Sequence, residues 1–185
     1  DKVEFEDELI QKTFDDYMEA LQDLYIIEDM RAWNPNIRSK TSIRSTPTRH
    51  FVDTSIACRA LGVMPDDLLN DLESFGLFFE DMAVRDLRVY AEYFNAEVLH
   101  YRDNAGLECD AVVHIDDGRW AAIEIKLGGD ELIEKGANSL KLLRDKIETK
   151  SEEQAPAFLM VLTAIGACYQ REDGVYVVPI NMLKP

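Results

Sequence analysis

The sequence predicts an α/β fold in which helices flank a mixed central sheet. After residue 63, the periodic segments follow the order helix, three strands, helix and two strands, which is typical of such a sheet. Asp116-Asp117-Gly118 is a hairpin turn signal between two apolar segments, 107–115 and 120–127. Residues 157–162 form a continuous apolar run, as expected for a strand that is buried on both faces.

The N-terminal residues predict a small α+β segment before this domain. Thr13 can cap a helix over about 14–24, and 25–27 and 50–52 predict a strand and its return strand. Apolar residues at helical spacing are expected to face a core: Phe14, Tyr17, Met18, Leu21 and Leu24. A helix followed by a hairpin is the ending of a winged-helix unit, so we expect a winged-helix-like segment.

A short helix and a Pro-containing turn predict the boundary between the two parts. Asp53 is expected to cap a helix that ends before Gly62. Met64-Pro65-Asp66-Asp67 follows directly. These signals predict a winged-helix-like segment at 1–62 and a second domain at 63–185.

The second domain is expected to contain two long helices, over about 76–94 and 131–150. Strands are expected at 97–102 and, after a hairpin around Glu172-Asp173-Gly174, at 175–180. The helical residues expected to face the core are Leu77, Phe78, Met82, Leu87, Tyr90 and Phe94, then Leu132, Leu140, Leu143 and Ile147.

Composition restricts the function classes. The 185 residues are 46% hydrophobic and 30% charged, and no apolar run approaches the roughly 20 residues that span a bilayer, so we expect no membrane partner. Three isolated cysteines suggest reduced thiols in the cytoplasm, and the three histidines lack zinc-ligand spacing. The chain begins with Asp1, so we expect a fragment of a longer protein.

A basic stretch between residues 30 and 50 stands out in a chain of net charge −16. Such a charge opposes general nucleic-acid binding, because phosphates are repelled. The stretch contains no acid, and its basic residues are expected to contact DNA backbone as a wing: Arg31, Arg38, Lys40, Arg44 and Arg49. The helix before it exposes acids, so we do not expect that helix to read DNA.

Polar residues on two apolar strands mark the candidate active site. Glu124 and Lys126 are two apart on a strand and should share one face, with the isoleucines beside them pointing into the core. Asp110 lies on the preceding strand. These residues resemble the PD-(D/E)xK motif of the restriction-endonuclease-like nuclease fold, in which Glu80 of Leu77-Phe78-Phe79-Glu80-Asp81 matches a carboxylate on the first helix.

This resemblance implies a site with named roles. Asp110 and Glu124, with Glu80, would be metal-binding carboxylates, and Lys126 would help to activate water. Three carboxylates and one ammonium lack about two positive charges, and pairs at roughly 4 Å interact by about 4 kcal/mol at an effective dielectric near 20. A divalent cation would supply that charge, and oxygen ligands favour Mg²⁺ or Mn²⁺.

A narrower resemblance covers nearly the whole chain. Arg49-His50-Phe51-Val52-Asp53-Thr54, Tyr101-Arg102-Asp103, Glu108-Cys109-Asp110 and Ile123-Glu124-Ile125-Lys126 are similar to the domain of unknown function that follows the ATPase core in prokaryotic AAA-type P-loop ATPases. This implies that the partner is the protein's own N-terminal ATPase domain. No GxxxxGK[ST] sequence occurs here, so ATP would bind only through that missing domain.

Alternatives remain for the individual residues. Glu124 and Lys126 could form an exposed charge pattern, Asp110 could pair with Lys126 as a structural ion pair, and Glu80 could be an ordinary surface residue. Glu108 could be another ligand or simply exposed. The hypotheses for function are a metal-dependent DNA phosphodiesterase, a catalytically silent DNA-binding module, and a protein-interaction module that regulates the ATPase.

Overall fold

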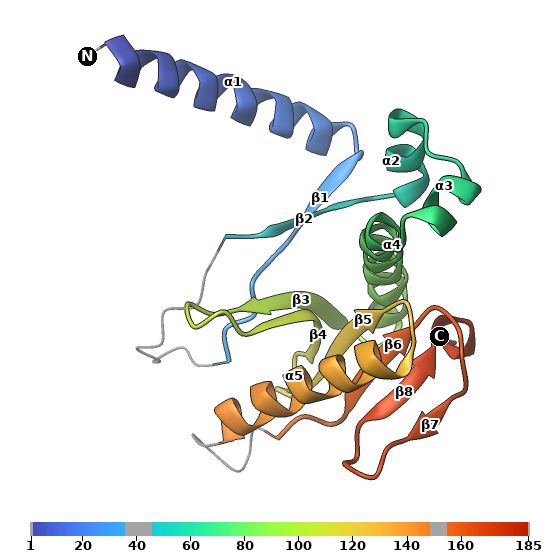
Figure 1. Ribbon diagram of the computed structural model, residues 1–185. Coiled ribbons are helices and arrows are strands. Elements are labelled where there is room, and N and C mark those ends of the chain that lie inside the picture. Colours follow the sequence, from blue (N-terminus) through green and yellow to red (C-terminus); the bar gives the residue numbers. More distant parts are fainter. Residues whose placement is uncertain (1, 36–45, 149–154, 185) are drawn as a thin grey trace.

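A six-stranded mixed sheet forms the centre of the protein in the computed structural model, which describes residues 2–35, 46–148 and 155–184 (Figure 1). The strand order is β3-β4-β5-β6-β8-β7. The first three strands pair antiparallel, β6 pairs parallel with both β5 and β8, and β7 is antiparallel to β8. The strands are β3 (Ala96–Arg102), β4 (Glu108–Ile115), β5 (Trp120–Lys126), β6 (Leu159–Thr163), β7 (Tyr169–Gln170) and β8 (Tyr176–Pro179).

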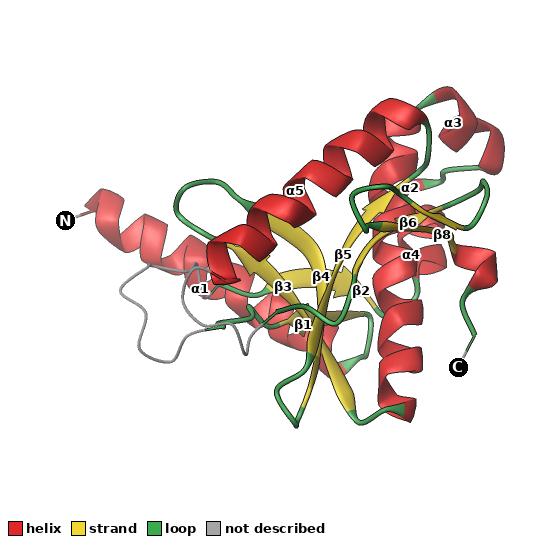
Figure 2. Cartoon of the chain, turned by 90° about the horizontal axis from the view of Figure 1, so that it is seen from below, coloured by secondary structure: helices red, strands yellow, loops and turns green. Residues whose placement is uncertain are grey.

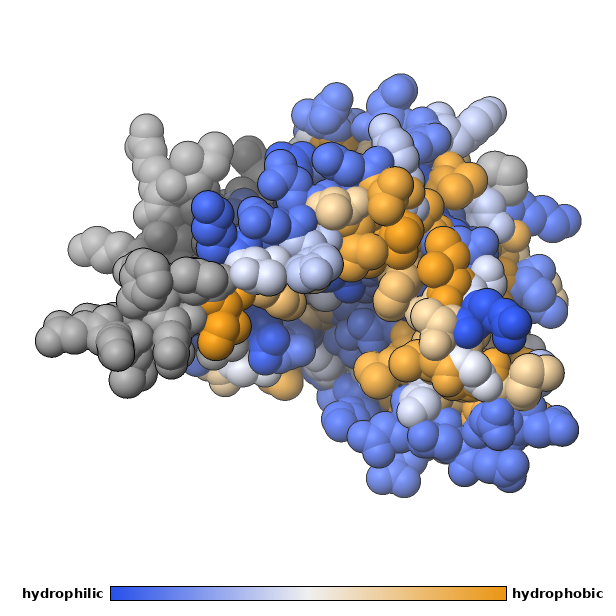
Figure 3. All heavy atoms as spheres, turned by 90° about the horizontal axis from the view of Figure 1, so that it is seen from above, coloured by the Kyte–Doolittle hydropathy of each residue, from blue (hydrophilic) through white to orange (hydrophobic). Residues whose placement is uncertain are grey.

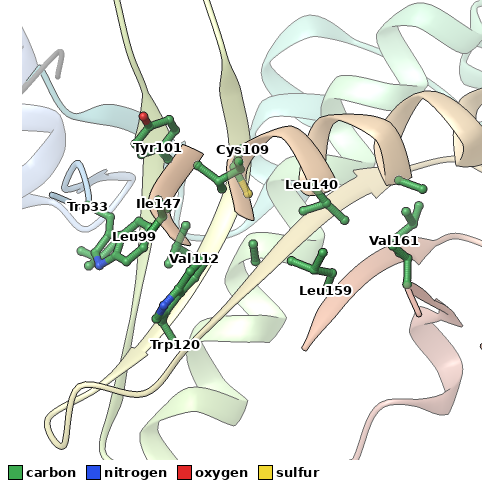
Figure 4. Close-up of a cluster of buried hydrophobic side chains, with 14 of the residues drawn as sticks. Trp33, Leu99, Tyr101, Cys109, Val112, Trp120, Leu140, Ile147, Leu159 and Val161 are labelled. Carbon is green, nitrogen blue, oxygen red and sulfur yellow. The ribbon is translucent and has the colours of Figure 1, made fainter. Parts of the chain in front are cut away.

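The two faces of this sheet are covered by two long helices, α4 (Leu72–Tyr93) on one face and α5 (Asp130–Glu148) on the other (Figures 1 and 2). The cluster under α5 includes Leu140 and Leu143 with Val112 and Val161 of the sheet (Figure 4). The cluster under α4 includes Ile123 and the other apolar residues of that strand face. This architecture confirms the predicted α/β fold with a mixed sheet flanked by helices.

The inward face of α4 differs from the prediction. The buried residues of the helix are Phe79, Ala83, Val84, Leu87 and Ala91. Leu77 and Phe94, which were expected to face the core, are more than half exposed, and Leu132 of α5 is also exposed. The helix begins at Leu72 rather than near Gly76. Its buried face contains the small residues Ala83 and Ala91, which allow this face to pack closely on the sheet.

The N-terminal part consists of α1 (Lys2–Asp23), a two-stranded sheet of β1 (Ile27–Met30) and β2 (Thr48–Phe51), α2 (Thr54–Leu61) and α3 (Pro65–Asn70). Asp53 caps α2 by accepting a hydrogen bond from the Ser55 N–H, and Gly62 ends the helix in the left-handed conformation, as predicted. The first strand begins two residues later than expected because Tyr25 adopts a positive φ of 54°, which belongs to a turn.

The expected core face of the first helix is wrong. α1 projects away from the rest of the molecule, and its C-terminal end leads into β1 (Figure 1). Phe14, Tyr17 and Leu24 are therefore exposed, whereas Met18 and Leu21 are partly buried. The helical spacing correctly predicted the helix, but a periodic pattern does not specify what packs against it.

Trp33 anchors the N-terminal part in the core of the sheet. Its ring is 95% buried, lies 4.6 Å from the ring of Trp120 between centroids, and belongs to the cluster under α5 (Figure 4). The backbone N–H of Trp33 donates to the His100 carbonyl at 2.6 Å. The side chain is thus a core anchor and is not accessible for stacking on a base.

Candidate functional site

Asp110, Glu124 and Lys126 converge in the structure. The Lys126 Nζ lies 2.8 Å from an Asp110 carboxylate oxygen and 2.8 Å from a Glu124 carboxylate oxygen. The same Asp110 oxygen accepts a hydrogen bond from the Ile125 N–H at 2.7 Å. Alternation along β5 produces this arrangement, because Glu124 and Lys126 share a face while Ile123 and Ile125 point into the cluster under α4.

The three side chains are shielded from solvent without being sealed from it. The exposed fractions of the side chains are 7% for Glu124, 17% for Asp110 and 21% for Lys126. Burial raises the pKa of Glu124 to about 7, and the neighbouring Asp110 charge adds to the effect. Burial alone would lower the pKa of Lys126, but Asp110 and Glu124 outweigh it and raise that pKa above its ordinary value.

Glu80 reaches the same electrostatic environment from α4. Burial raises the pKa of Glu80 to about 7, and the Asp110 charge is the next largest cause, with Lys126 acting in the opposite direction. A single ammonium group therefore does not neutralise the carboxylates around it. The excess negative charge favours uptake of protons or of a cation.

A divalent metal such as Mg²⁺ requires oxygen donors arranged around one point. Within residues 2–35, 46–148 and 155–184, no group of three or more His, Cys, Asp or Glu side chains is arranged to hold a metal ion. The two carboxylates that do converge, Asp110 and Glu124, are hard oxygen donors, and Mg²⁺ is often held by one or two carboxylates, substrate phosphates and several waters. The residues thus fit a two-carboxylate Mg²⁺ or Mn²⁺ site and do not form a closed three-ligand site.

The segment that contains these residues matches a known family. Residues 75–183, more than half of the chain, match the family described as a domain of unknown function (DUF4143). The chain belongs to this family. Domains of the DUF4143 family commonly accompany AAA-type ATPases.

A second family covers the N-terminal part of this DUF4143 protein. Residues 4–67 match a domain of unknown function (DUF8612). No curated protein and no solved structure matches the chain. Within the described residues, no helix of the DUF4143 protein has the length and apolar character needed to cross a membrane.

The basic residues predicted to contact DNA lie apart from the carboxylate site or outside the described residues. Arg31 donates to Glu97 at 2.5 Å, and Arg49 lies 3.5 Å from Asp29. The Arg49 guanidinium also lies over the Phe14 ring, 5.8 Å from its centroid. The other three predicted residues, Arg38, Lys40 and Arg44, lie outside the described residues of the DUF4143 protein.

Glu108 does not join the site. It pairs with Arg102 at 2.8 Å across the antiparallel strands, and its side chain is half exposed. Of the two alternatives that the sequence left open for Glu108, the structure shows the exposed position. Asp110 does pair with Lys126, as another alternative proposed.

Two structural aspartates of the DUF4143 protein, Asp103, which is buried, and Asp81, which is partly buried, were not singled out by their sequence pattern. Asp103 accepts hydrogen bonds from the Ala105 and Leu107 N–H groups and pairs with Lys146 of α5, which holds the β3–β4 turn against the helix. Asp81 lies directly after Glu80 and accepts bonds from the β2–α2 segment. The only signal was the position of Asp103 at a turn before Gly106, which suggests structure rather than chemistry.

Proposed function

We propose that this DUF4143 domain carries a metal-dependent site that hydrolyses DNA phosphodiester bonds, and that it works as an accessory domain of a AAA-type ATPase. The observation that carries the proposal is the convergence of Asp110, Glu124 and Lys126, with Lys126 2.8 Å from both carboxylates. This set, with Glu80 close enough for the charges of Asp110 and Glu124 to raise its pKa, resembles the PD-(D/E)xK arrangement. On this proposal the domain has a restriction-endonuclease-like fold.

Each residue of the site has a distinct role in this proposal. Asp110 and Glu124 would hold a Mg²⁺ or Mn²⁺ ion, which when bound supplies Lewis-acid stabilisation of charge on a phosphodiester, and Glu80 would add negative charge beside them. Asp110 is kept in place by the Ile125 N–H, so its orientation does not depend on the metal. Glu124 is held within a nearly dry environment, which strengthens its interaction with any positive charge.

Lys126 acts as a positive group rather than as a proton acceptor. The two carboxylates raise its pKa above the ordinary value, so it stays protonated near neutral pH. A protonated ammonium can donate a hydrogen bond to an attacking water or to a phosphate oxygen, but it cannot take a proton. The role that this proposal leaves to Lys126 is therefore to orient the attacking water or to stabilise charge on the phosphate.

The proposal is tested by a DNA cleavage assay with Mg²⁺ and Mn²⁺ on linear, supercoiled and single-stranded DNA. The chain is assayed alone and together with its ATPase. We expect cleavage that requires the metal, and at least a hundredfold loss in Lys126→Ala and Asp110→Asn. Lys141→Ala is the matched control, because Lys141 also pairs with a carboxylate, that of Asp173 at 2.9 Å, but lies outside the site.

The assay separates an active site from a structural cluster. Cleavage that is equal in the wild type and in Lys126→Ala would indicate a contaminating nuclease and refute the proposal. The absence of cleavage under every condition, with the ATPase present and hydrolysing ATP, would also refute it.

DNA binding through the basic stretch remains a separate prediction. The two described arginines, Arg31 and Arg49, already contact carboxylates, so their release to phosphates would break existing ion pairs. We expect any DNA binding to be weak above physiological salt, which fluorescence anisotropy across a salt series measures. Tight binding that is insensitive to salt would contradict this expectation.

A further inference from the structure

A groove runs between β2, α2, α3 and the start of α4. Its volume is about 610 Å³. Apolar side chains provide much of its lining: Phe51, Leu61, Val63, Leu68, Leu77 and Phe78. A groove of this size and apolar character can bind the apolar face of an amphipathic helix.

Exposed apolar residues extend the groove into a surface patch. Leu61, Met64, Leu69, Leu72 and Leu77 are between 61% and 70% exposed, and they lie within 17 positions of one another on α2, α3, α4 and the loop at Met64. Viewed from above, Figure 3 shows an apolar area in the region of α2 and α3, bordered by hydrophilic side chains. A dense group of exposed leucines on helices is unusual for a surface that faces only water.

The surroundings of this groove are acidic. Asp67, Asp71, Glu80 and Asp81 line it together with Arg49 and His50, and Arg49 already lies 3.5 Å from Asp29. Residues 53–81 contain seven acids and one basic residue, Arg59. Asp67 and Asp71 accept hydrogen bonds from the backbone at helix starts, which does not neutralise their charge. Neither of them, nor Asp66 or Glu73, forms an ion pair with another described residue.

We propose that this groove, defined by residues 48–81, binds an amphipathic helix whose apolar stripe is flanked by lysines and arginines. The apolar stripe would cover the exposed leucines, and the basic flanks would meet the acidic border. Anionic partners do not fit this border, because DNA and acidic lipid surfaces carry the same charge sign. The inference does not rest on the proposed nuclease site.

A second copy of the chain is a poorer occupant. α1 exposes apolar side chains, and its described side chains from Ile10 to Asp23 include four acids and one base, Lys12. Placed in the groove, it would bring like charges together. A basic helix from a partner, such as the associated ATPase, satisfies both the apolar and the electrostatic requirements.

The test uses a synthetic 20-residue helical peptide with leucines at i, i+3, i+4 and i+7 spacing and lysines elsewhere. A fluorescent label reports its binding to the whole chain by anisotropy. We expect saturable binding that weakens at least tenfold in Leu77→Ser, and at least tenfold when glutamates replace the lysines of the peptide. Leu142→Ser is the matched control, because Leu142 is a similarly exposed helical leucine on α5 outside the groove.

A second measurement locates the peptide. Hydrogen exchange should slow in residues 54–80 when the lysine peptide is bound, and not in the Leu77→Ser variant, whose circular dichroism should match the wild type. The proposal would be overturned if Leu77→Ser bound the lysine peptide as tightly as Leu142→Ser does, or if the glutamate peptide bound as tightly as the lysine peptide. An absence of protection at residues 54–80 would also overturn it. Binding to phosphatidylserine vesicles in preference to the peptide, or dimerisation that Leu77→Ser abolishes, would also overturn it.

Discussion

Gly136 of α5 lies directly against Glu124 of β5: a Cβ atom added to Gly136 would lie 3.3 Å from the Glu124 Cβ and 3.3 Å from a methyl group of Val161. The absence of a side chain at this one position of the helix allows α5 to approach the strand that carries the candidate site. The packing of α5 thus limits how Glu124 can move. Glu124 is therefore positioned partly by α5, a helix that supplies none of the proposed site residues.

The first prediction compares two helical glycines. Gly76→Ala should raise the free energy of unfolding by about 0.5–1 kcal/mol, because its added Cβ meets nothing within 4 Å and alanine favours the helix. Gly136→Ala should lose this gain or destabilise the protein, because the Cβ crowds buried atoms on a rigid strand. Chemical denaturation measures both, and an equal gain in the two variants would contradict the close packing.

The second prediction concerns the pair of Lys126 and Asp110. Lys126→Met should lower the free energy of unfolding by about 1–3 kcal/mol, because two largely buried carboxylates lose their positive partner. The double variant Asp110→Asn/Lys126→Met should be more stable than the sum of the two single effects predicts. Strict additivity in this double-mutant cycle would show that the two side chains do not interact in solution.

The third prediction concerns pH in the metal-free protein, kept in EDTA. The pKa of Glu80 is raised from its ordinary value of 4.5 to about 7, so the folded state binds this proton more tightly than the unfolded state. The free energy of unfolding should therefore fall as pH rises from about 4.5 to about 7. Glu80→Gln should be more stable than the wild type by roughly 1–3 kcal/mol at pH 8.

The advantage of Glu80→Gln should shrink as pH falls, because the wild-type carboxyl then becomes neutral in the folded protein. Thermal denaturation of both proteins between pH 5 and pH 8 measures the difference. A difference that does not change with pH would show that burial and the neighbouring Asp110 charge do not raise the pKa of Glu80 in the folded protein. Glu73→Gln, an exposed position on the same helix, serves as the control and should show no such trend.

The fourth prediction concerns Asp81, which holds the N-terminal segment on α4. Its carboxylate accepts hydrogen bonds from the Phe51 N–H at 2.9 Å and the Thr54 hydroxyl at 2.7 Å, and lies 3.2 Å from the His50 Nδ1. Asp81→Asn should lower the free energy of unfolding by about 1–3 kcal/mol. Asp86→Asn on the same helix should have less than half this effect, because among the described residues its carboxylate bonds to the neighbouring Arg85 and not to another element.

Urea denaturation of the two aspartate variants tests this contrast. Hydrogen exchange of β2 and α2 should increase in Asp81→Asn and not in Asp86→Asn, because Asp81 accepts hydrogen bonds from Phe51 and Thr54, whereas Asp86 pairs with Arg85 of its own helix. Unchanged exchange in β2 and α2 would show that other contacts, such as the anchor at Trp33, hold the segment in place.

The order of elements followed from local patterns, because turn signals, caps and apolar alternation act over a few residues. The sequence was therefore sufficient to predict the hairpin at Asp116-Asp117-Gly118, the α2 cap at Asp53 and the shared face of Glu124 and Lys126. It was insufficient for the face of α4, where Phe79 rather than Leu77 is buried. Both residues lie on apolar helical stripes, and only the sheet decides which stripe can approach it.

The sequence by itself determined which helices and strands form and which side chains share one face of a strand, such as Glu124 and Lys126. Only the tertiary structure decided that Trp33 enters the core under α5, that Asp81 joins distant segments, and that Lys126 lies between two carboxylates. These contacts join residues far apart in the chain. They depend on how helices and strands pack in three dimensions, and periodicity along one segment carries no information about that packing.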